Sequence, residues 1–263
     1  MPEPKILPLT GKRIVVTRTR AQASDMASKL AAFGAEVVEL PVIRISKEIS
    51  KQALADVMLE LGSYDWLVFT SANGVHNFFS EFLRLFDDIR ALGLMRIACV
   101  GEATAKAVAE FHLKVEVLPA KATAEALAGE MIDTGSMDSA KVLVVTGNLN
   151  RDVIVTKLEE ARAIVDVLQV YKTEAVDLKA EPAAAEFRRL GADAVLFASS
   201  SSAQSFVDQG DVVKVGPGGK QPLYGSIGPQ TSETMRKVGL RVDFEAKTPG
   251  IAELVAELIR ALA

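Results

Sequence analysis

The sequence predicts an α/β protein built from two similar doubly wound units with parallel sheets. Two observations support this prediction: short apolar strands alternate with amphipathic helices, and the chain repeats itself after about 128 residues. Apolar runs of strand length, such as Val142–Val145, are followed by a small or polar turn and then by helical periodicity. This alternation is typical of parallel sheets whose two faces are covered by helices.

The elements follow in order from the N-terminal end. Residues 12–17 form an apolar strand, and Ala21–Phe33 is expected to be a helix because its apolar residues recur on one face. Gly34 ends this helix, and Val37–Leu40 is the next strand. Further strands are predicted at Trp66–Phe69, Ile97–Val100, Val142–Val145, Ala194–Phe197 and Leu223–Ile227.

The repeat relates the first half of the chain to the second. Matching segments occur in the same order and at a nearly constant separation. They are Val15–Thr17 with Val144–Thr146, Asp65–Phe79 with Asp193–Val207, and Gly101–Thr104 with Gly228–Thr231. Because the period is too long for a solenoid, we expect two related units.

Two domain layouts fit the repeat. A tandem arrangement would divide near Thr134–Ser139, where Gly and Ser residues gather. Alternatively, the extended segments Glu39–Ile45 and Gln169–Thr173 cross between the domains, and the middle of the chain is inserted into the outer domain. The residues alone leave both layouts open.

The composition narrows the function classes. The chain has 263 residues, a net charge of −4, one Cys and two His. This excludes an intrachain disulfide framework, makes a Cys- or His-based metal site improbable, and argues against a nucleic-acid partner. We find no targeting or membrane-spanning segment, and the lone Cys99 lies in an apolar strand. We therefore expect a protein of the cytoplasm that binds neither metal nor membrane.

The candidate binding positions follow the strands. In parallel sheets, ligands bind beyond the carboxyl ends of the strands, where helices begin. Small and hydroxyl-bearing residues gather there, and helix N-termini of this kind suit carboxylates or phosphates, although the same residues are ordinary N-caps. The chain has neither a P-loop nor a G-x-G-x-x-G motif. The candidates are Thr17, Arg18, Ser71, Asn73, Gly101, Thr104, Asn148, Arg151, Ser199, Ser201, Gly228 and Thr231.

Tyr171 is the candidate catalytic residue. It is expected to end a strand at a crossing between domains, where its phenol either packs or faces the ligand as a general acid. His76 and His112 are expected to be structural or solvated, and Cys99 a buried strand thiol. The serines 199–202 lack the Gly-flanked elbow of a hydrolase.

Short motifs spread along the chain resemble those of one enzyme family. They are Val16-Thr17-Arg18, Phe69-Thr70-Ser71-x-x-Gly74-Val75, Val100-Gly101-x-x-Thr104-Ala105, Gly147-Asn148-Leu149-x-Arg151, Val170-Tyr171-x-Thr173, Phe197-x-Ser199-x-Ser201 and Ile227-Gly228-Pro229-x-Thr231. In this order and spacing, over essentially the whole chain, they resemble the uroporphyrinogen-III synthase family.

The resemblance implies an activity. That family closes the linear tetrapyrrole hydroxymethylbilane to uroporphyrinogen III, with loss of water and inversion of the terminal pyrrole ring, in haem biosynthesis. It uses no cofactor. The resemblance implies that Tyr171 assists departure of the hydroxyl group, and that Ser71, Thr104, Ser199 and Thr231 bind substrate carboxylates. It makes Arg18 and Arg151 ion partners of the substrate.

The resemblance also implies an architecture and partners. It favours the crossing layout, with residues 1–40 and 174–263 as one domain, residues 41–173 as the other, a two-stranded β linker between them, and the substrate in the inter-domain cleft. We expect a cytoplasmic monomer that receives hydroxymethylbilane from the upstream hydroxymethylbilane synthase.

Two departures from the family pattern occur, Ala198 where a hydroxyl or aromatic residue is common and residues 161–163 where a Gly is usual. The alternatives are a non-catalytic two-domain binding protein for an anionic ligand and a nucleotide-sugar transferase, for which the chain is short.

Overall fold

The computed structural model describes residues 7–149 and 152–263, and it confirms the α/β class with parallel sheets. The chain forms two compact units. Unit 1 comprises Met1–Arg44 and Glu174–Ala263, and unit 2 comprises Ile45–Thr173. The resemblance implies a first crossing after residue 40, and the compact units divide between Arg44 and Ile45.

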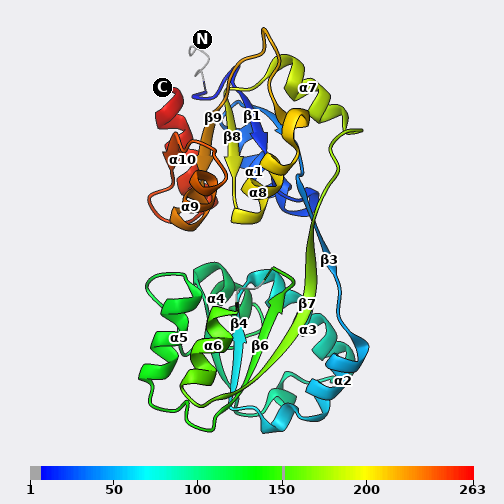
Figure 1. Ribbon diagram of the computed structural model, residues 1–263, viewed down its shortest axis with the longest axis vertical. Coiled ribbons are helices and arrows are strands. Elements are labelled where there is room, and N and C mark those ends of the chain that lie inside the picture. Colours follow the sequence, from blue (N-terminus) through cyan, green and yellow to red (C-terminus); the bar gives the residue numbers. More distant parts are fainter. Residues whose placement is uncertain (1–6, 150–151) are drawn as a thin grey trace, which may run out of the picture. The chain divides into compact units, whose positions relative to one another are not determined.

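Unit 1 contains a five-stranded sheet in the order β10-β9-β8-β1-β2, with parallel pairing throughout. The strands are β1 (Arg13–Val16), β2 (Glu36–Glu39), β8 (Ala194–Phe197), β9 (Leu223–Ser226) and β10 (Phe244–Glu245). Helices α1 (Arg20–Ala32) and α10 (Ile251–Leu262) cover one face (Figure 1). Helices α7 (Pro182–Leu190), α8 (Ser200–Asp208) and α9 (Pro229–Lys237) cover the other.

Alternating side chains of the interior strand β1 explain these two layers. Ile14 and Val16 of β1 pack with α1 and α10, whereas Val15 packs with the opposite layer. All three side chains are fully buried. Helix α1 ends just before Gly34, as expected, and this glycine has a φ of +89°. A side chain is disfavoured there because of the positive φ and because its Cβ would lie 2.9 Å from Thr10 Oγ1.

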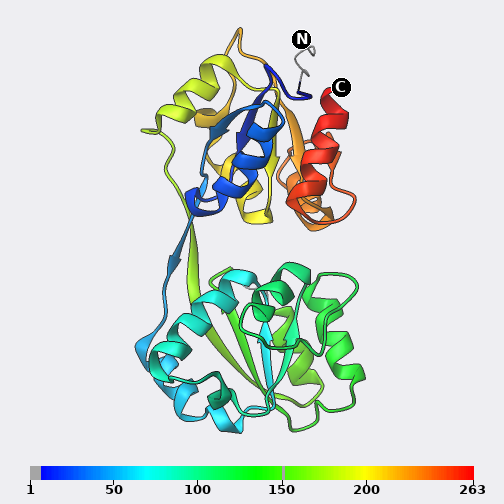
Figure 2. The ribbon, with the colours of Figure 1, turned by 180° about the vertical axis from the view of Figure 1, so that it is seen from behind.

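Unit 2 contains the second sheet, in the order β3-β7-β6-β4-β5. Its strands are β3 (Ile43–Lys47), β4 (Trp66–Phe69), β5 (Arg96–Cys99), β6 (Lys141–Gly147) and β7 (Ile164–Ala175). The pairs β4/β5, β4/β6 and β6/β7 are parallel. Helices α2 (Lys51–Leu59), α3 (Ala72–Leu85) and α4 (Glu102–Ala109) pack on one face, and α5 (Ala124–Asp133) and α6 (Val153–Glu160) on the other (Figure 2).

The two sheets have the same order of equivalent strands. Strands β2-β1-β8-β9-β10 of unit 1 correspond to β7-β6-β4-β5 of unit 2, followed by a bridge from Ala98 to Val117 in place of the last strand. Each half of the sequence therefore divides between the units. The first half gives β1 and β2 to unit 1 and β4 and β5 to unit 2, and the second half does the reverse.

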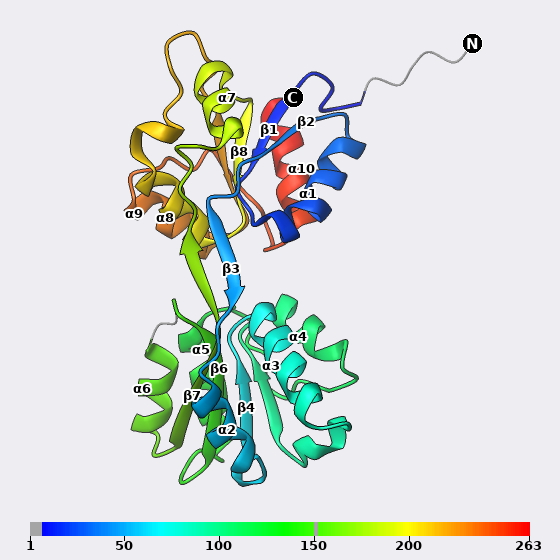
Figure 3. The same cartoon turned by 90° about the vertical axis from the view of Figure 1, so that its right-hand side faces the viewer.

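Strands β3 and β7 span the points where the chain passes from one unit to the other. They are neighbours in one sheet, and Figure 3 shows them side by side. The Val176 N–H also donates to the Val42 carbonyl at 2.9 Å. Tyr171 lies within β7, which continues to Ala175, so the expectation that Tyr171 ends its strand was wrong. The strand continues because it pairs with β3 beyond the point where β6 ends.

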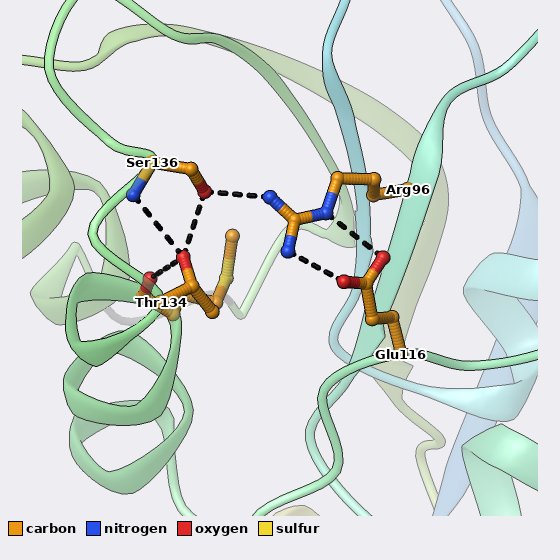
Figure 4. Close-up of polar contacts among 5 residues, drawn as sticks. Arg96, Glu116, Thr134 and Ser136 are labelled. Carbon is orange, nitrogen blue, oxygen red and sulfur yellow. Dashed lines mark hydrogen bonds and ion pairs between the residues drawn. The ribbon is translucent and has the colours of Figure 1, made fainter.

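The amino edge of the unit 2 sheet is fixed by a chain of polar contacts around Arg96 (Figure 4). The Arg96 guanidinium lies 4.0 Å over the Trp66 ring, and its Nε donates to Glu116 at 2.8 Å. Its Nη1 donates to Ser136 Oγ at 2.6 Å, and Ser136 contacts Thr134 Oγ1 at 2.7 Å. A cavity of about 490 Å³ lies beside these groups at the amino ends of β4 and β5. Because its polar groups bind one another, we assign it no ligand.

Among the described residues, no helix is both long enough and apolar enough to cross a membrane.

Candidate functional site

The predicted site residues lie at the carboxyl ends of the parallel strands in both units. In unit 2, the loops after β4, β5 and β6 bear Ser71, Gly101 and Asn148. Asn73 and Thr104 lie in the first turns of the helices that follow β4 and β5. In unit 1, the loops after β1, β8 and β9 and the helical turns that follow them bear Thr17, Arg18, Ser199, Ser201, Gly228 and Thr231. Helices begin at most of these loops, so backbone N–H groups and the positive ends of helix dipoles gather at each edge. Arg151 lies outside the described residues.

The most closely connected group in unit 2 centres on Tyr171. Its hydroxyl lies 3.0 Å from Ser71 Oγ. Ser71 is the N-cap of α3, and its Oγ accepts the Gly74 N–H at 3.0 Å. The Tyr171 ring lies over Gly147, where a Cβ would come within 2.4 Å of ring atoms Cε2 and Cζ. The structure therefore brings together Tyr171 and Ser71, two residues predicted separately.

Electrostatics at Tyr171 have opposing contributions. Burial raises the pKa of the phenol above its ordinary value, because the charged form loses hydration. The hydrogen bond with Ser71 acts in the opposite direction and favours the phenolate. The net shift is upward, so Tyr171 is a protonated phenol at neutral pH and retains a proton that it can donate.

Three further residues, Thr70, Thr146 and Gly147, lie beside this group; the sequence places them in strand-end segments, but they were not chosen as site residues. Thr70 Oγ1 lies 3.2 Å from Thr146 Oγ1 and 3.3 Å from the Val145 carbonyl oxygen, which ties the ends of β4 and β6 together. Gly147 provides the space for the phenol ring. The repeat contained a signal for Gly147, because the equivalent position in the first half is occupied by Arg18, a much larger residue.

The other unit 2 candidates are held by backbone contacts. Asn148 is exposed, and its amide pairs with Thr173: Nδ2 donates to the carbonyl at 3.1 Å, and Oδ1 accepts the N–H at 2.7 Å. The Asn73 carbonyl accepts a hydrogen bond from Asn77 Nδ2 at 2.9 Å. Thr104 is buried in the first turn of α4, and its N–H donates to the Gly101 carbonyl at 3.0 Å.

In unit 1, the loop after β1 bears the predicted residues Thr17 and Arg18. Thr17 is fully buried, and its Oγ1 donates to the Leu196 carbonyl at 2.8 Å. Arg18 is half-buried. Burial lowers the pKa of its guanidinium below the ordinary value, and the carboxylate of Asp25 opposes this shift. Arg18 is therefore a cation held partly away from water, a state that favours pairing with an anion.

The loops after β8 and β9 start helices in two different ways. Ser199 caps α8 by accepting the Ser202 N–H at 3.2 Å, and its Oγ lies 3.1 Å from Ser201 Oγ. Gly228 precedes α9 and makes no side-chain cap, and the first turn of α9 contains no acidic residue. Thr231 is buried in that turn. The first-turn N–H groups of α9 therefore form a positive helix end suited to a carboxylate.

The remaining sequence predictions concern residues away from Tyr171. Cys99 is fully buried in β5, as expected. His76 and His112 are exposed, and His76 Nε2 lies 3.0 Å from a carboxylate oxygen of Glu110. Among the described residues, no three His, Cys, Asp or Glu side chains come together in a group that could hold a metal ion.

Comparisons with known proteins show the family and the fold of this chain. The family profile described as uroporphyrinogen-III synthase HemD matches residues 24–256. The uroporphyrinogen-III synthase of Synechococcus elongatus is 29% identical over 250 residues, covering 91% of this chain and 91% of that protein.

Solved structures share the fold. A mutant uroporphyrinogen III synthase from Thermus thermophilus superposes with a TM-score of 0.69 at 16% identity, covering 96% of this chain and 99% of the other. The uroporphyrinogen-III synthetase of Helicobacter pylori gives a TM-score of 0.58 at 17% identity, covering 93% and 97%. With the profile match spanning most of its length, the chain belongs to the uroporphyrinogen-III synthase family.

Proposed function

We propose that this chain closes hydroxymethylbilane to uroporphyrinogen III, with loss of water and inversion of the terminal pyrrole ring. The family it belongs to catalyses this cyclisation step of tetrapyrrole biosynthesis. The observation that supports the proposal most directly is the partly buried phenol of Tyr171, held 3.0 Å from Ser71 at the carboxyl edge of the unit 2 sheet.

Tyr171 would act as the proton donor to the leaving group. The C–O bond of the hydroxymethyl group breaks, both electrons go to oxygen, and the phenol proton completes a molecule of water. The pyrrole is left as an azafulvenium cation, whose methylene carbon bonds to the substituted α-carbon of the terminal pyrrole to give a spiro intermediate. The older bond from that α-carbon to its methylene bridge then breaks and re-forms at the free α-carbon, which inverts the ring, and the proton lost from this carbon returns to the phenolate. Because the phenol is a weak acid, most of the rate enhancement must come from holding the reacting carbon atoms in position.

The substrate is a polyanion, whereas this protein has a net charge of −4. Binding therefore relies on local positive features rather than on a broad basic surface. Helix N-termini, hydroxyl groups and the partly buried guanidinium of Arg18 provide such features at the two carboxyl edges. The residues proposed to bind carboxylates are Arg18, Asn73, Gly101, Thr104, Asn148, Ser199, Ser201, Gly228 and Thr231.

The cellular setting is also a proposal. The only cysteine of the chain is a buried free thiol, which suits the reducing cytoplasm. We propose a cytoplasmic monomer that takes its substrate from the enzyme that builds the linear tetrapyrrole.

An isomer assay tests the activity. Hydroxymethylbilane made in situ is added to the purified protein, the products are oxidised, and the type I and type III porphyrins are resolved by chromatography. We expect type III to predominate, because uncatalysed closure gives type I. Type I alone, at every protein concentration, would reject the proposed activity.

A further inference from the structure

Two residues hold the phenol of Tyr171 from different sides. Gly147 lies beneath the ring at the end of β6, and Ser71 contacts the hydroxyl from the N-terminus of α3. We propose that Gly147 and Ser71 are positioning residues for Tyr171, and that Ser71 serves this role instead of binding a substrate carboxylate. The inference rests on the proposed function, because it assigns a purpose to the placement of Tyr171.

The ring of Tyr171 fills the space that a side chain at position 147 would occupy. An ideal Cβ at this position would lie 2.4 Å from two ring carbons of Tyr171 and 2.9 Å from its hydroxyl oxygen. These distances are well below van der Waals contact, so any side chain at 147 must displace the ring. Gly147 does not have a positive φ, so alanine would fit the backbone and the strain would fall on Tyr171.

Hydrogen-bond capacity determines what Ser71 can do. A serine hydroxyl has one proton and two acceptor sites. One acceptor site is filled by the Gly74 N–H at 3.0 Å, which leaves the proton of Ser71 available for the phenol oxygen 3.0 Å away. When Ser71 donates to Tyr171, the phenol proton remains available for the leaving hydroxyl group.

The same contact stabilises the product of proton transfer. As Tyr171 gives up its proton, negative charge develops on an oxygen that accepts the Ser71 hydroxyl near the N-terminus of α3. A donor directed at developing charge, close to the positive end of a helix, lowers the barrier to that transfer. A serine engaged in this way has no proton left for a substrate carboxylate.

The described part of unit 1 lacks this arrangement. Arg18 occupies the position equivalent to Gly147, and Ser199 the position equivalent to Ser71. Ser199 also caps its helix, but its Oγ pairs with Ser201 Oγ at 3.1 Å. The cap is thus common to both units, and the contact with a phenol is found in unit 2.

The test measures kcat and KM for Ser71→Ala, Ser71→Thr and Gly147→Ala in the isomer assay. We expect Ser71→Ala to lower kcat about tenfold with little change in KM, because one hydrogen bond to the reacting group is lost. Ser71→Thr keeps a hydroxyl and should restore most of the rate. Gly147→Ala should lower kcat at least as much in a protein that still folds.

Matched controls separate positioning from stability. Ser50→Ala removes a serine N-cap of the same kind from α2, where Ser50 Oγ accepts the Ala53 N–H at 3.3 Å. This variant should leave kcat unchanged. Gly129→Ala adds a methyl group to α5 at a position where the new Cβ would have no atom from outside its own helix turn within 4 Å. This variant should also leave kcat unchanged.

A double mutant provides the deciding measurement. If Ser71 acts through Tyr171, adding Ser71→Ala to Tyr171→Phe should change kcat by less than about twofold. Full additivity of the two effects would overturn the inference, and so would a Ser71→Ala variant that raises KM at constant kcat, as expected for a lost carboxylate ligand. An unchanged rate in Tyr171→Phe itself would instead reject the proposed role of the phenol.

Discussion

Units 1 and 2 build the same sheet from equivalent strands but place different chemistry at its carboxyl edge. At the carboxyl end of β1, unit 1 has Thr17 and Arg18, whereas unit 2 has Thr146 and Gly147 at the equivalent end of β6. In unit 2 the missing side chain at 147 leaves room for Tyr171, so this edge presents a phenol. In unit 1 the same position presents a partly buried cation. The same sheet thus presents a phenol at this position in one unit and a guanidinium in the other.

A second difference lies beside the first. Thr70 in unit 2 corresponds to Ala198 in unit 1. In unit 2, Thr70 and Thr146 contact each other through their hydroxyls at 3.2 Å. In unit 1, Ala198 has no hydroxyl, and Thr17 donates instead to the Leu196 carbonyl at 2.8 Å. The threonine equivalent to Thr146 therefore bonds to the backbone of the neighbouring strand β8 in unit 1, where no hydroxyl faces it from position 198.

The largest expected effect tests whether the two units also unfold separately. Phe78 and Phe206 are equivalent residues, 0% and 2% exposed, each packed among other rings. Phe78→Ala and Phe206→Ala should each lower the free energy of unfolding by about 3–5 kcal/mol. Trp66, the only tryptophan, lies in unit 2, so its fluorescence during denaturation reports that unit.

We expect Phe78→Ala to shift the unfolding transition that Trp66 fluorescence reports. Phe206→Ala should leave that transition in place and shift only the part of the circular-dichroism transition that Trp66 does not report. Equal shifts of the Trp66 transition in both variants would show that the units unfold as one cooperative system.

The next effect tests the difference in chemistry. Tyr171→Phe should lower kcat about 100-fold, equivalent to about 2.7 kcal/mol, because the proton donor is lost while the ring remains. Tyr224→Phe is the matched control in unit 1, where the ring packs against Phe197 with centroids 6.2 Å apart. It should leave kcat within about twofold, since a side chain away from the reacting atoms adds no transition-state interaction. A loss in Tyr224→Phe as large as that in Tyr171→Phe would break the comparison.

A smaller expected effect is a difference in stability between matched substitutions at the amino edges of the two sheets. Asp193 and Asp65 are equivalent, and each accepts a backbone N–H at 2.8 Å from the start of the central strand. Asp193 is also buried and paired with Lys220 Nζ at 2.5 Å, whereas Asp65 is exposed. We expect Asp193→Asn to cost about 2 kcal/mol of stability, and Asp65→Asn about 1 kcal/mol or less.

The pH dependence should follow Asp193. Burial disfavours its charged form, but the hydrogen bonds from Lys220 and the Arg13 N–H outweigh this and lower the pKa of the carboxyl. Its stabilising contribution is therefore complete above the unfolded pKa of about 3.9 and is lost as pH falls through the lower folded value. Denaturation curves from neutral to acidic pH should show this loss in the wild-type protein and a shallower loss in Asp193→Asn. Parallel curves for the two proteins would contradict the assignment.

The smallest effect compares two buried side chains on equivalent strands. Cys99 in β5 corresponds to Ser226 in β9, and both are fully buried. Burial raises the pKa of the Cys99 thiol to about 12, so the native protein should react with a disulfide reagent only when unit 2 opens. The rate should therefore rise with denaturant, and Ser226→Cys would provide the same probe for unit 1. Rapid reaction of Cys99 in the absence of denaturant would show that this edge of unit 2 opens readily.

The sequence was sufficient to predict the fold class and the repeat. Strands such as Val142–Val145 are short, apolar and followed by helical periodicity, and these are properties of neighbouring residues. The same reasoning placed the candidate site residues at strand ends, because parallel sheets bring those ends to one edge. It also assigned Cys99 correctly to a buried strand.

Only the tertiary structure decided which strands share a sheet and what surrounds Tyr171. The strands of both units have the same apolar pattern, so hydropathy cannot say that β1 pairs with β8 from the opposite half of the sequence. That choice depends on contacts between residues 180 positions apart, as in the bond from the Arg13 N–H to Asp193. The contact between Gly147 and the ring of Tyr171 likewise joins two strands. The repeat marks Gly147 as unusual, but only the structure shows that the ring of Tyr171 fills the space above it.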